Sequence, residues 1–344
     1  MLESQHSERM DLLGLHKVAI LVVCFLFAYD YFNTTTVVVR VKEPRFTLLG
    51  PYNTVDIVVK DEYDRLIDLE DFHFKINTLP CKGYDNGLLL VIIVASNPYN
   101  VENRMTIRNT WGQNIDATKV IFLVGESDNA TIAQTIRTES EMFKDIVQGN
   151  FIDAYRNMTY KHVMGLKWVA HHCPTARYIL KTDDDVVVNS DALRMFLAEE
   201  LSPWGAKDLL ICEVFFKAEV HRKNSSKWMV TKEEYSGNYY PTYCAGWAVL
   251  YSRDVVARLL KAAANSPYFW IDDVHITGIL AEQLRIPRTP FGSLVLSSHR
   301  ANLLLAFGAS YVGEFLLGPP DITVPKMNQI WKAIPTQPPD TKYF

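Results

Sequence analysis

Three consecutive carboxylates are the residues of this sequence that say most about chemistry. Asp183, Asp184 and Asp185 interrupt an otherwise apolar stretch, YILKTDDDVVVN, at residues 178–189. Burying like charges together raises their pKa values and costs free energy, so we expect these acids at a strand end or beside a cation. A hard divalent ion such as Mn²⁺ or Mg²⁺ suits carboxylate oxygens and keeps positions open for phosphate oxygens. The alternative is an acidic turn or a helix N-cap before Ala192.

A second acidic pair, Asp272 and Asp273, follows the aromatic residues 268–270 and precedes a helix-like stretch at 274–284. Capping of that helix is the purely structural explanation. Beside aromatic side chains that could bind a sugar, however, an acid can serve as the general base that removes a proton from a hydroxyl group. The two acidic sites together indicate metal-assisted group transfer.

Two arginines lie four residues apart, Arg104 and Arg108, in the segment NRMTIRNTWG at residues 103–112. If the segment is helical they share one face, close to the end of the first predicted strand. Guanidinium groups pair bidentately with phosphate oxygens, so we expect a diphosphate clamp here. A solvated basic helix face is the alternative.

The apolar pattern that must position these residues alternates between strand-like and helix-like segments. The continuous run LLLVIIVA at residues 88–95 predicts a strand that is buried on both faces. Further strands are expected at 119–124, 178–180, 209–216 and 248–251, and helices at 101–111, 129–143, 160–171, 253–264 and 274–284. This alternation is typical of an α/β fold with a parallel core, in which ligands bind at the carboxyl ends of the strands.

Overall composition excludes several classes of protein. The 344 residues carry 35 Lys and Arg against 39 Asp and Glu, a formal charge of −4, which argues against a partner such as nucleic acid. With 48% hydrophobic and 22% charged residues, the chain has the composition of a folded protein.

The N-terminal region contains one uninterrupted apolar run, VAILVVCFLFAY, at residues 18–29. It is shorter than the roughly 20 residues that span a bilayer, and bulky residues follow it where a cleavage site needs small ones. We therefore predict a retained signal-anchor at 18–32 behind a cytoplasmic tail at 1–17. A cleaved signal and a buried core helix are the alternatives. A stem at 33–87 and one catalytic domain at 88–344 complete the predicted organisation.

Placement in the secretory pathway would make two other features meaningful. Asn-x-Ser/Thr acceptors occur at Asn129, Asn157 and Asn224, and a fourth, Asn33, lies too close to the predicted anchor. Apart from Cys24 in the apolar run, the four remaining cysteines could form two disulfides in an oxidising lumen, with three possible pairings.

Six ordered segments within residues 88–333 resemble the β-1,3-glycosyltransferases of glycosyltransferase family 31, which includes galactosyl- and N-acetylglucosaminyltransferases. The segments are RMTIRNTWG (104–112), YRNMTYKHVMGLKW (155–168), YILKTDDDVVVN (178–189), KWMV (227–230), YPTYCAGWAVLYS (240–252) and IDDVHITGIL (271–280). Six segments in the family's order are far more specific than a single Asp-x-Asp motif.

The resemblance implies a GT-A-type α/β domain with a mostly parallel sheet, behind a type II anchor in the Golgi membrane. It also implies an inverting, Mn²⁺-dependent transfer of galactose or N-acetylglucosamine from a UDP-sugar. The acceptor would be the 3-hydroxyl of a glycan on a glycoprotein or glycolipid, and the product a β1-3 linkage. A galactosyltransferase is the favoured interpretation, although the sequence leaves the donor sugar and the acceptor open.

Residue roles follow from the matching segments. The resemblance makes Asp185 the principal metal ligand, with Asp183 and Asp184 contributing to the metal and nucleotide site. It makes Asp273 the general base, next to Asp272, where many members carry Glu. It further places Arg104, Arg108 and Lys161 near UDP, and Tyr243, Gly246 and Trp247 on the acceptor and donor-sugar side.

One position departs from the family pattern. Members usually carry a metal-binding His four residues before a Pro near the C-terminus, whereas this chain has Asp321 before Pro325. Asp can ligate Mn²⁺, so Asp321 is a candidate third metal ligand. The departure also keeps open a catalytically silent member that acts as a carbohydrate-binding or chaperone-like partner. Another metal-dependent enzyme, such as a phosphohydrolase, is a further alternative.

The matching segments also bear on the cysteines. Cys212 and Cys244 flank the KWMV and YPTYC segments and are therefore the first expected disulfide. That choice leaves Cys81 to pair with Cys173.

Overall fold

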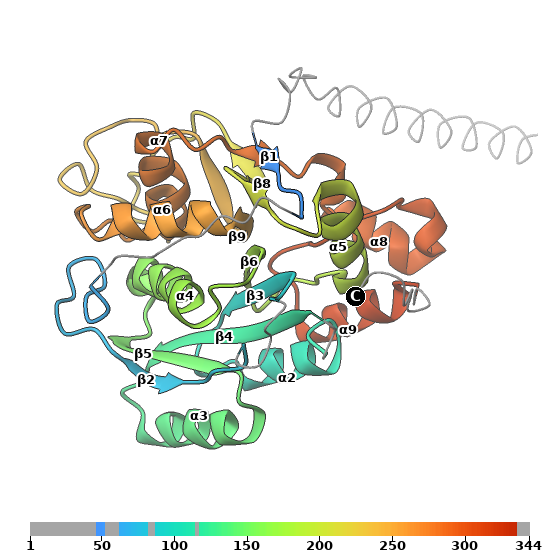
Figure 1. Ribbon diagram of the computed structural model, residues 1–344, viewed down its shortest axis with the longest axis horizontal. Coiled ribbons are helices and arrows are strands. Elements are labelled where there is room, and N and C mark those ends of the chain that lie inside the picture. The colour runs from blue at the N-terminus through green and yellow to red at the C-terminus, as the bar shows by residue number, and fades with distance from the viewer. Residues whose placement is uncertain (1–45, 52–61, 82–86, 114–116, 336–344) are drawn as a thin grey trace, which may run out of the picture. The chain divides into compact units, whose positions relative to one another are not determined.

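The computed structural model describes residues 46–51, 62–81, 87–113 and 117–335 (Figure 1). The expected tail, the expected anchor and Asn33 lie outside these residues. Within the described ranges, no helix is both long and apolar enough to cross a bilayer.

A mixed sheet of eight strands forms the centre of the described fold, in the order β10-β8-β9-β6-β3-β4-β5-β2. The strands are β2 Phe74–Asn77, β3 Leu90–Ala95, β4 Thr118–Glu126, β5 Ile146–Ile152, β6 Tyr178–Asp183, β8 Leu210–Phe215, β9 Tyr243–Ser252 and β10 Thr289–Pro290. Two short strands, β1 Thr47–Leu48 and β7 Ala206–Lys207, form a separate antiparallel pair. The α/β expectation is confirmed.

The expectation of a mostly parallel sheet is only partly right. Strands β3, β4, β5 and β6 pair in parallel, as do β8 and β10, but β9 runs antiparallel to both β6 and β8, and β2 is antiparallel to β5. The pattern of strands and helices along the sequence could not reveal these directions. No helix separates β8 from β9, and without such a crossover β9 runs antiparallel to β8.

Helices cover both faces of the sheet (Figure 1). One face packs against α4 Met158–His172, α6 Arg253–Ala263 and the π-helix η3 Val274–Leu280, which continues into α7 Ala281–Gln283. The other face packs against α2 Val101–Asn109, α3 Ala130–Phe143, α5 Ser190–Met195, α8 Ser298–Phe307 and α9 Val324–Ala333. Short helical turns complete the described fold at η1 Tyr155–Asn157, η2 Phe196–Leu201, η4 Gly292–Leu294 and η5 Ala309–Tyr311.

The apolar run that ends in β3 explains why this strand is central. Val91 and Ile93 contribute to the core under α4, whereas Leu90, Ile92 and Val94 contribute to the core on the opposite face. Side chains alternate across a strand, so a strand covered on both faces needs apolar residues at every position.

Part of the segment that the sequence assigns to a stem belongs to the folded unit. Strand β2 pairs with β5, and Leu66, Ile67 and Phe72 are buried in the core beneath α4. Among the described residues of this segment, one short edge strand and a few side chains reach the core, which is too little to produce a clear hydrophobic period in the sequence.

The structure contains the two expected disulfides, Cys81–Cys173 and Cys212–Cys244. Cys81–Cys173 ties the end of the predicted stem to the end of α4, and Cys212–Cys244 joins β8 to β9. Among the candidate glycosylation sites, Asn129 and Asn224 are exposed and Asn157 is half-buried. Asn129 also caps α3, since its Oδ1 accepts hydrogen bonds from the N–H groups of Thr131 and Ile132.

We predict that removing either disulfide destabilises the full chain. The residues joined are 92 apart in Cys81–Cys173 and 32 apart in Cys212–Cys244. Loop-closure entropy then gives losses of roughly 4.5 and 3.5 kcal/mol for the two double Cys→Ala variants. Urea unfolding of each variant beside the oxidised wild type measures the loss. Two variants as stable as the wild type would contradict a structural role for these bonds.

Candidate active site

The acidic motif leaves the sheet at the carboxyl end of β6. Asp183 is the last residue of that strand and pairs in register with Ala95 at the end of β3. Because the two strands are parallel, the residues that follow them, Ser96 and Asp184, emerge at the same edge. This confirms the strand-end position that the sequence predicts for the carboxylates.

Asp184 is buried and held by polar side chains of the loop after β3 and of α2. Its Oδ2 accepts hydrogen bonds from Ser96 Oγ at 2.6 Å and from Asn100 Nδ2 at 3.0 Å. Asn103 Nδ2 donates to the Asp184 carbonyl at 3.1 Å. Burial raises the pKa of Asp184 in spite of these bonds. The contacts give Asp184 the role of anchoring the acidic turn.

Arg104 is the largest correction to the predicted site. Its side chain is 0% exposed and forms two hydrogen bonds with Glu139, from Nε at 2.8 Å and from Nη2 at 2.7 Å. Its remaining N–H groups donate to Ser96 Oγ and to the carbonyls of Asn97 and Pro98. All five donors are used, so Arg104 has none left for a diphosphate and instead supports the loop that holds Asp184.

Arg108 is likewise engaged within the protein. Its Nε and Nη2 each donate to Asp145 at 2.8 Å, and its Nη1 donates to Glu139 at 2.7 Å. The guanidinium lies over the rings of Phe122 and Phe143. The predicted clamp of two arginines is therefore wrong, because carboxylates of the protein occupy the places that phosphate oxygens were expected to take.

Lys161 is on α4 and is also paired. Its buried Nζ donates to the Ser96 carbonyl at 2.7 Å and forms an ion pair with Asp153 at 2.8 Å. The ammonium lowers the pKa of Asp184 by its charge, although burial of that carboxyl has the larger, opposite effect. Lys161 thus lies beside the acidic turn, with part of its hydrogen-bonding capacity already used, and its expected contact with UDP stays a prediction.

Lys181 connects the two acidic sites. From inside β6, its Nζ donates to Asp183 Oδ1 at 2.7 Å and to the Gly246 carbonyl at 2.5 Å, and it lies 4.0 Å from Asp272 Oδ2. Burial lowers the pKa of Lys181, but the charges of Asp183 and Asp272 outweigh it and the net shift is upward. The structure therefore brings the predicted metal motif and the acidic pair Asp272–Asp273 to one site.

Asp272 is held by a buried histidine of α4. His162 Nδ1 lies 2.8 Å from Asp272 Oδ2, and its Nε2 lies 3.1 Å from the Tyr251 hydroxyl. Burial raises the pKa of Asp272, but Lys181 and the His162 hydrogen bond outweigh it and lower the pKa to about 2. An ionised carboxylate only accepts, so Nδ1 of the histidine carries the proton and the Tyr251 hydroxyl donates to Nε2.

The pKa of Asp273 is shifted upward, in contrast to that of Asp272. Burial and the adjacent Asp272 charge raise its pKa to about 7, although the N–H groups of Val274 and Gly246 donate to its oxygens at 2.7 and 3.1 Å. A side chain at position 246 would place its Cβ 3.2 Å from Asp273 Cβ, so glycine permits this approach. Asp273 also caps η3, so the capping and the base interpretations of the sequence describe the same residue.

Asp185 and Asp321 add negative charge near Asp183. Burial, with smaller contributions from the charges of Asp183, Asp184 and Asp321, raises the pKa of Asp185 to about 7. The Asp185 carbonyl accepts a hydrogen bond from Ile322 N–H at 3.2 Å, which brings the Asp321 segment to the motif. This accumulation of carboxylates fits the donor chemistry of a hard divalent cation.

In the part of the chain that the structure describes, no group of three or more His, Cys, Asp or Glu is arranged to hold a metal ion. A site that binds Mg²⁺ or Mn²⁺ through one or two carboxylates, with substrate phosphates and water as the other ligands, needs no such group. Asp183 and Asp185 are therefore candidate ligands, with Asp321 beside them.

The expected sugar-side residues lie along β9 and its neighbours. Trp247 donates from Nε1 to Glu213 at 2.9 Å, and its carbonyl accepts from Thr182 Oγ1 in β6. Burial, with a smaller contribution from the charge of Asp273, raises the pKa of Tyr243 to about 12. A Cβ at Gly278 of η3 would lie 3.1 Å from Tyr243 Cβ, so this tyrosine packs against the helix that Asp273 caps. Tyr243, Gly246 and Trp247 are thus brought to the acidic site.

Tyr155 is a site residue that the sequence did not single out. It is 48% exposed, and its ring lies 5.9 Å from that of Trp270. Burial, with smaller contributions from the charges of Asp272, Asp273 and Asp183, raises the pKa of its phenol to about 12. The charges of both acidic groups thus act on Tyr155. Lys181 and His162 were also missed, because each occurs in a segment whose apolar residues indicate only a buried strand or helix.

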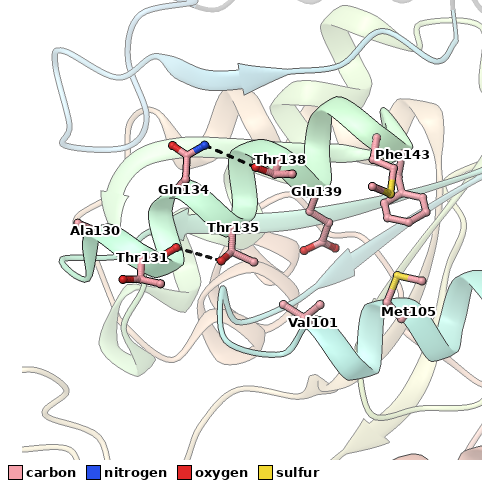
Figure 2. Close-up of a pocket in the computed structure, with 10 residues that line it drawn as sticks. Val101, Met105, Ala130, Thr131, Gln134, Thr135, Thr138, Glu139 and Phe143 are labelled. Atoms are coloured by element: carbon pink, nitrogen blue, oxygen red, sulfur yellow. Dashed lines mark hydrogen bonds between the residues drawn. The ribbon is translucent and has the colours of Figure 1, made fainter.

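An open groove of about 670 Å³ is lined by residues of α2 and α3, and its lining includes none of the acidic-site aspartates. Figure 2 shows how these residues lie around the groove. Most of its lining is apolar or carries small hydroxyl groups. Its single carboxylate, Glu139, is bound to Arg104 and Arg108. The groove thus lacks the charged groups that the candidate chemistry needs.

Comparison with known proteins connects this site to a family. The family model described as Galactosyltransferase matches residues 102–291, more than half of the chain and a range that includes both acidic sites. Beta-1,3-galactosyltransferase 5 of Pan troglodytes is 33% identical over 203 residues, 57% of this chain and 66% of that protein. The matched region thus spans slightly less than two thirds of that relative's length.

Other relatives are matched over a larger share of their length. Beta-1,3-galactosyltransferase 5 of Mus musculus is 33% identical over 244 residues, 69% of this chain and 74% of that protein. Beta-1,3-galactosyltransferase 1 of Mus musculus is 31% identical over 226 residues, 64% of this chain and 68% of that protein.

Among solved structures, a glycosyltransferase involved in glycosylation of the major capsid of PBCV-1 has a TM-score of 0.36 and 9% identity. It covers 71% of this chain and 100% of its own. Similarity at this level does not bear on function. The sequence matches do establish the relationship: the chain belongs to the galactosyltransferase family.

Proposed function

We propose that this protein is an inverting β-1,3-galactosyltransferase that transfers galactose from UDP-galactose to the 3-hydroxyl of an acceptor glycan. The observation that carries the proposal is Asp273, a carboxylate with a pKa raised to about 7 that lies at one site with the Asp183–Asp185 motif. The names of the relatives support galactose as the transferred sugar.

The two carboxylates of the pair have different tasks in this mechanism. Asp272 stays ionised between Lys181 and His162, and its charge helps keep the pKa of Asp273 near neutrality. Each Asp273 oxygen accepts one backbone hydrogen bond and has a further lone pair, so it can accept the proton of the acceptor 3-hydroxyl. The deprotonated 3-hydroxyl oxygen attacks the anomeric carbon of galactose on the side opposite UDP. UDP leaves, and this single displacement inverts the configuration of the anomeric carbon.

The acidic motif would serve the departing UDP. Asp185 and Asp183, with Asp321 near them, would hold a divalent cation, which as a Lewis acid would offset charge on the diphosphate. The turn that carries these residues is fixed by the bonds of Asp184 to Ser96 and Asn100, and Arg104 in turn holds Ser96.

We also propose that the protein is a type II membrane protein of the Golgi with a lumenal catalytic domain. The apolar run at residues 18–29 and the two disulfides support this location, since disulfides persist in oxidising compartments. The chief alternative is that the protein is a catalytically silent family member that binds glycans. Asp321, at a position where members usually carry His, favours this alternative.

The central test is UDP release by the purified full chain with UDP-galactose, Mn²⁺ and varied acceptors. We expect acceptor-dependent release and a β1-3-linked product. Asp273→Asn should lower kcat by about 10²- to 10⁴-fold, because it removes the base. Asp128→Asn, at an exposed position, is the matched control. Release at the rate without enzyme, with every donor and acceptor, would reject the catalytic proposal.

The raised pKa of Asp273 also predicts a pH dependence. Protonated Asp273 cannot accept a proton, so kcat/KM should be maximal above pH 7 and fall as the pH decreases through about 7. A pH–rate profile at saturating Mn²⁺ measures this. An acid limb at the ordinary pKa of an aspartate, near 4, would mean that Asp273 is not the base.

His162→Ala should destabilise the protein and change the acid limb of that profile, because Asp272 loses its charge-assisted hydrogen bond. We expect a loss of about 2 kcal/mol in urea unfolding from the hydrogen bond alone. His162→Asn keeps an N–H donor and should recover part of both effects. An unchanged pH profile in the alanine variant would assign His162 a purely structural role.

Asp321→Ala tests the departure from the family pattern. If Asp321 helps to hold the cation, the variant should need more Mn²⁺ for half-maximal activity and should bind Mn²⁺ more weakly in calorimetry. Asp321→His, which supplies a nitrogen ligand instead, should retain binding. Equal Mn²⁺ affinity and activity in the alanine variant would remove Asp321 from the metal site.

A further inference from the structure

A second hollow lies beside the candidate active site, formed by the loop before β9 and by the end of η3 with α7. Its volume is about 550 Å³, and Tyr235, Tyr239, Tyr240, Glu282 and Gln283 contribute to its lining. No step of the proposed mechanism uses these residues. The combination of aromatic rings with a carboxylate and an amide therefore calls for a separate explanation.

The aromatic wall is fixed by the fold. Arg222 donates to four carbonyls of the loop, those of Val230 and Thr231 from Nη1 and those of Tyr235 and Gly237 from Nη2. The rings of Tyr235 and Tyr240 lie 5.1 Å apart. A wall held in this way needs little ordering when a ligand binds, which favours affinity.

The hollow lies close to Tyr243, which the resemblance places on the acceptor side of the active site. The Tyr240 ring lies 6.1 Å from that of Tyr243, and the charge of Asp273 helps raise the pKa of both phenols, after the larger effect of burial. From Tyr239 to Tyr243 an extended chain would measure at most about 13 Å. The hollow is therefore within reach of a short oligosaccharide whose end is at the base.

The charges around the hollow favour an uncharged ligand. Glu282 lines it and faces Tyr235, whose pKa it raises after the larger effect of burial. The nearby cation Arg222 is engaged with the loop carbonyls, and Arg288 donates to the carbonyls of Ile286 and Thr242. Among the residues that line the hollow, Glu282 is the single charged side chain, so a carboxylate or sulfate on the ligand would meet its negative charge.

We propose that this hollow is a subsite for a neutral sugar residue of the acceptor glycan, one or more residues away from the sugar that receives galactose. The inference rests on the proposed function. Tyrosine rings offer apolar faces to the C–H groups of a sugar, while Glu282 and Gln283 supply partners for its hydroxyls. The protein thereby selects acceptors by length as well as by their terminal sugar.

Tyr239→Ala tests the subsite, because Tyr239 is 54% exposed and its loss should not affect folding. Tyr311→Ala, at a 67% exposed tyrosine of η5, is the matched control. The probes are N-acetylglucosamine and its oligomers of two to four residues. Tyr239→Ala should raise KM for the oligomers about 2- to 10-fold, with kcat and the KM for the single sugar unchanged.

Saturation-transfer NMR with the same oligomers provides a readout that does not depend on catalysis. The wild type and Tyr311→Ala should both give oligomer signals that Tyr239→Ala weakens. Glu282→Gln should still give signals with these neutral oligomers and should, unlike the wild type, also give signals with an oligosaccharide that contains glucuronic acid.

The outcomes separate the subsite from the proposed function. Transfer by the wild type with equal KM values for Tyr239→Ala and the control, on every probe, overturns the subsite and leaves the function intact. If the wild type transfers no sugar to these probes, NMR alone decides the subsite, and oligomer signals that are absent or insensitive to Tyr239 overturn it. The proposed function fails separately, when UDP release stays at the rate without enzyme with every donor and acceptor.

Discussion

One buried ammonium group holds the candidate site together. Lys181 is 2% exposed and contacts Asp183, Asp272 and the Gly246 carbonyl, which belong to β6, to the segment before η3 and to β9. Without a cation between them, the two groups of carboxylates would repel one another in a medium of low dielectric constant. Loss of one partner of such a buried ion pair typically costs about 3–5 kcal/mol, so the arrangement of three elements depends on this contact.

The same ammonium also separates the protonation states of two adjacent aspartates. Against the effect of burial, it lowers the pKa of Asp272, assisted by His162, whereas burial and then the fixed Asp272 charge raise the pKa of Asp273. Two like carboxylates thus acquire different roles from their surroundings alone, one as a permanent anion and one as a group that exchanges a proton near neutral pH. The resemblance assigns Asp273 the part of the base by its position, and the contacts of the two residues supply a physical reason for the difference.

The strands and the strand-end position of the acids could be predicted, because both depend on local periodicity. The roles of Arg104 and Arg108 could not, since their partners Glu139 and Asp145 lie more than 30 residues away on α3 and after it. An arginine looks the same in sequence whether its partner is a carboxylate of the protein or a phosphate of a ligand. The part of the predicted stem that folds escaped notice for a similar reason, because Phe72 gains its burial from distant α4 and not from a pattern of its own.

The packing of β9 against η3 sets the base and the second hollow at the same time. At Gly246 a Cβ would approach Asp273, and at Gly278 a Cβ would lie 3.1 Å from Tyr243 Cβ and 3.2 Å from Pro241 Cγ. Thr277 Oγ1 links the two elements further, since it accepts from Cys244 N–H and donates to the Asp273 carbonyl. The loop before β9, by contrast, takes its shape from Arg222 and contributes no hydrogen bond to Asp273. Residues of that loop can therefore change without displacing Asp273, so the shape of the second hollow and the position of this carboxylate are set by separate contacts.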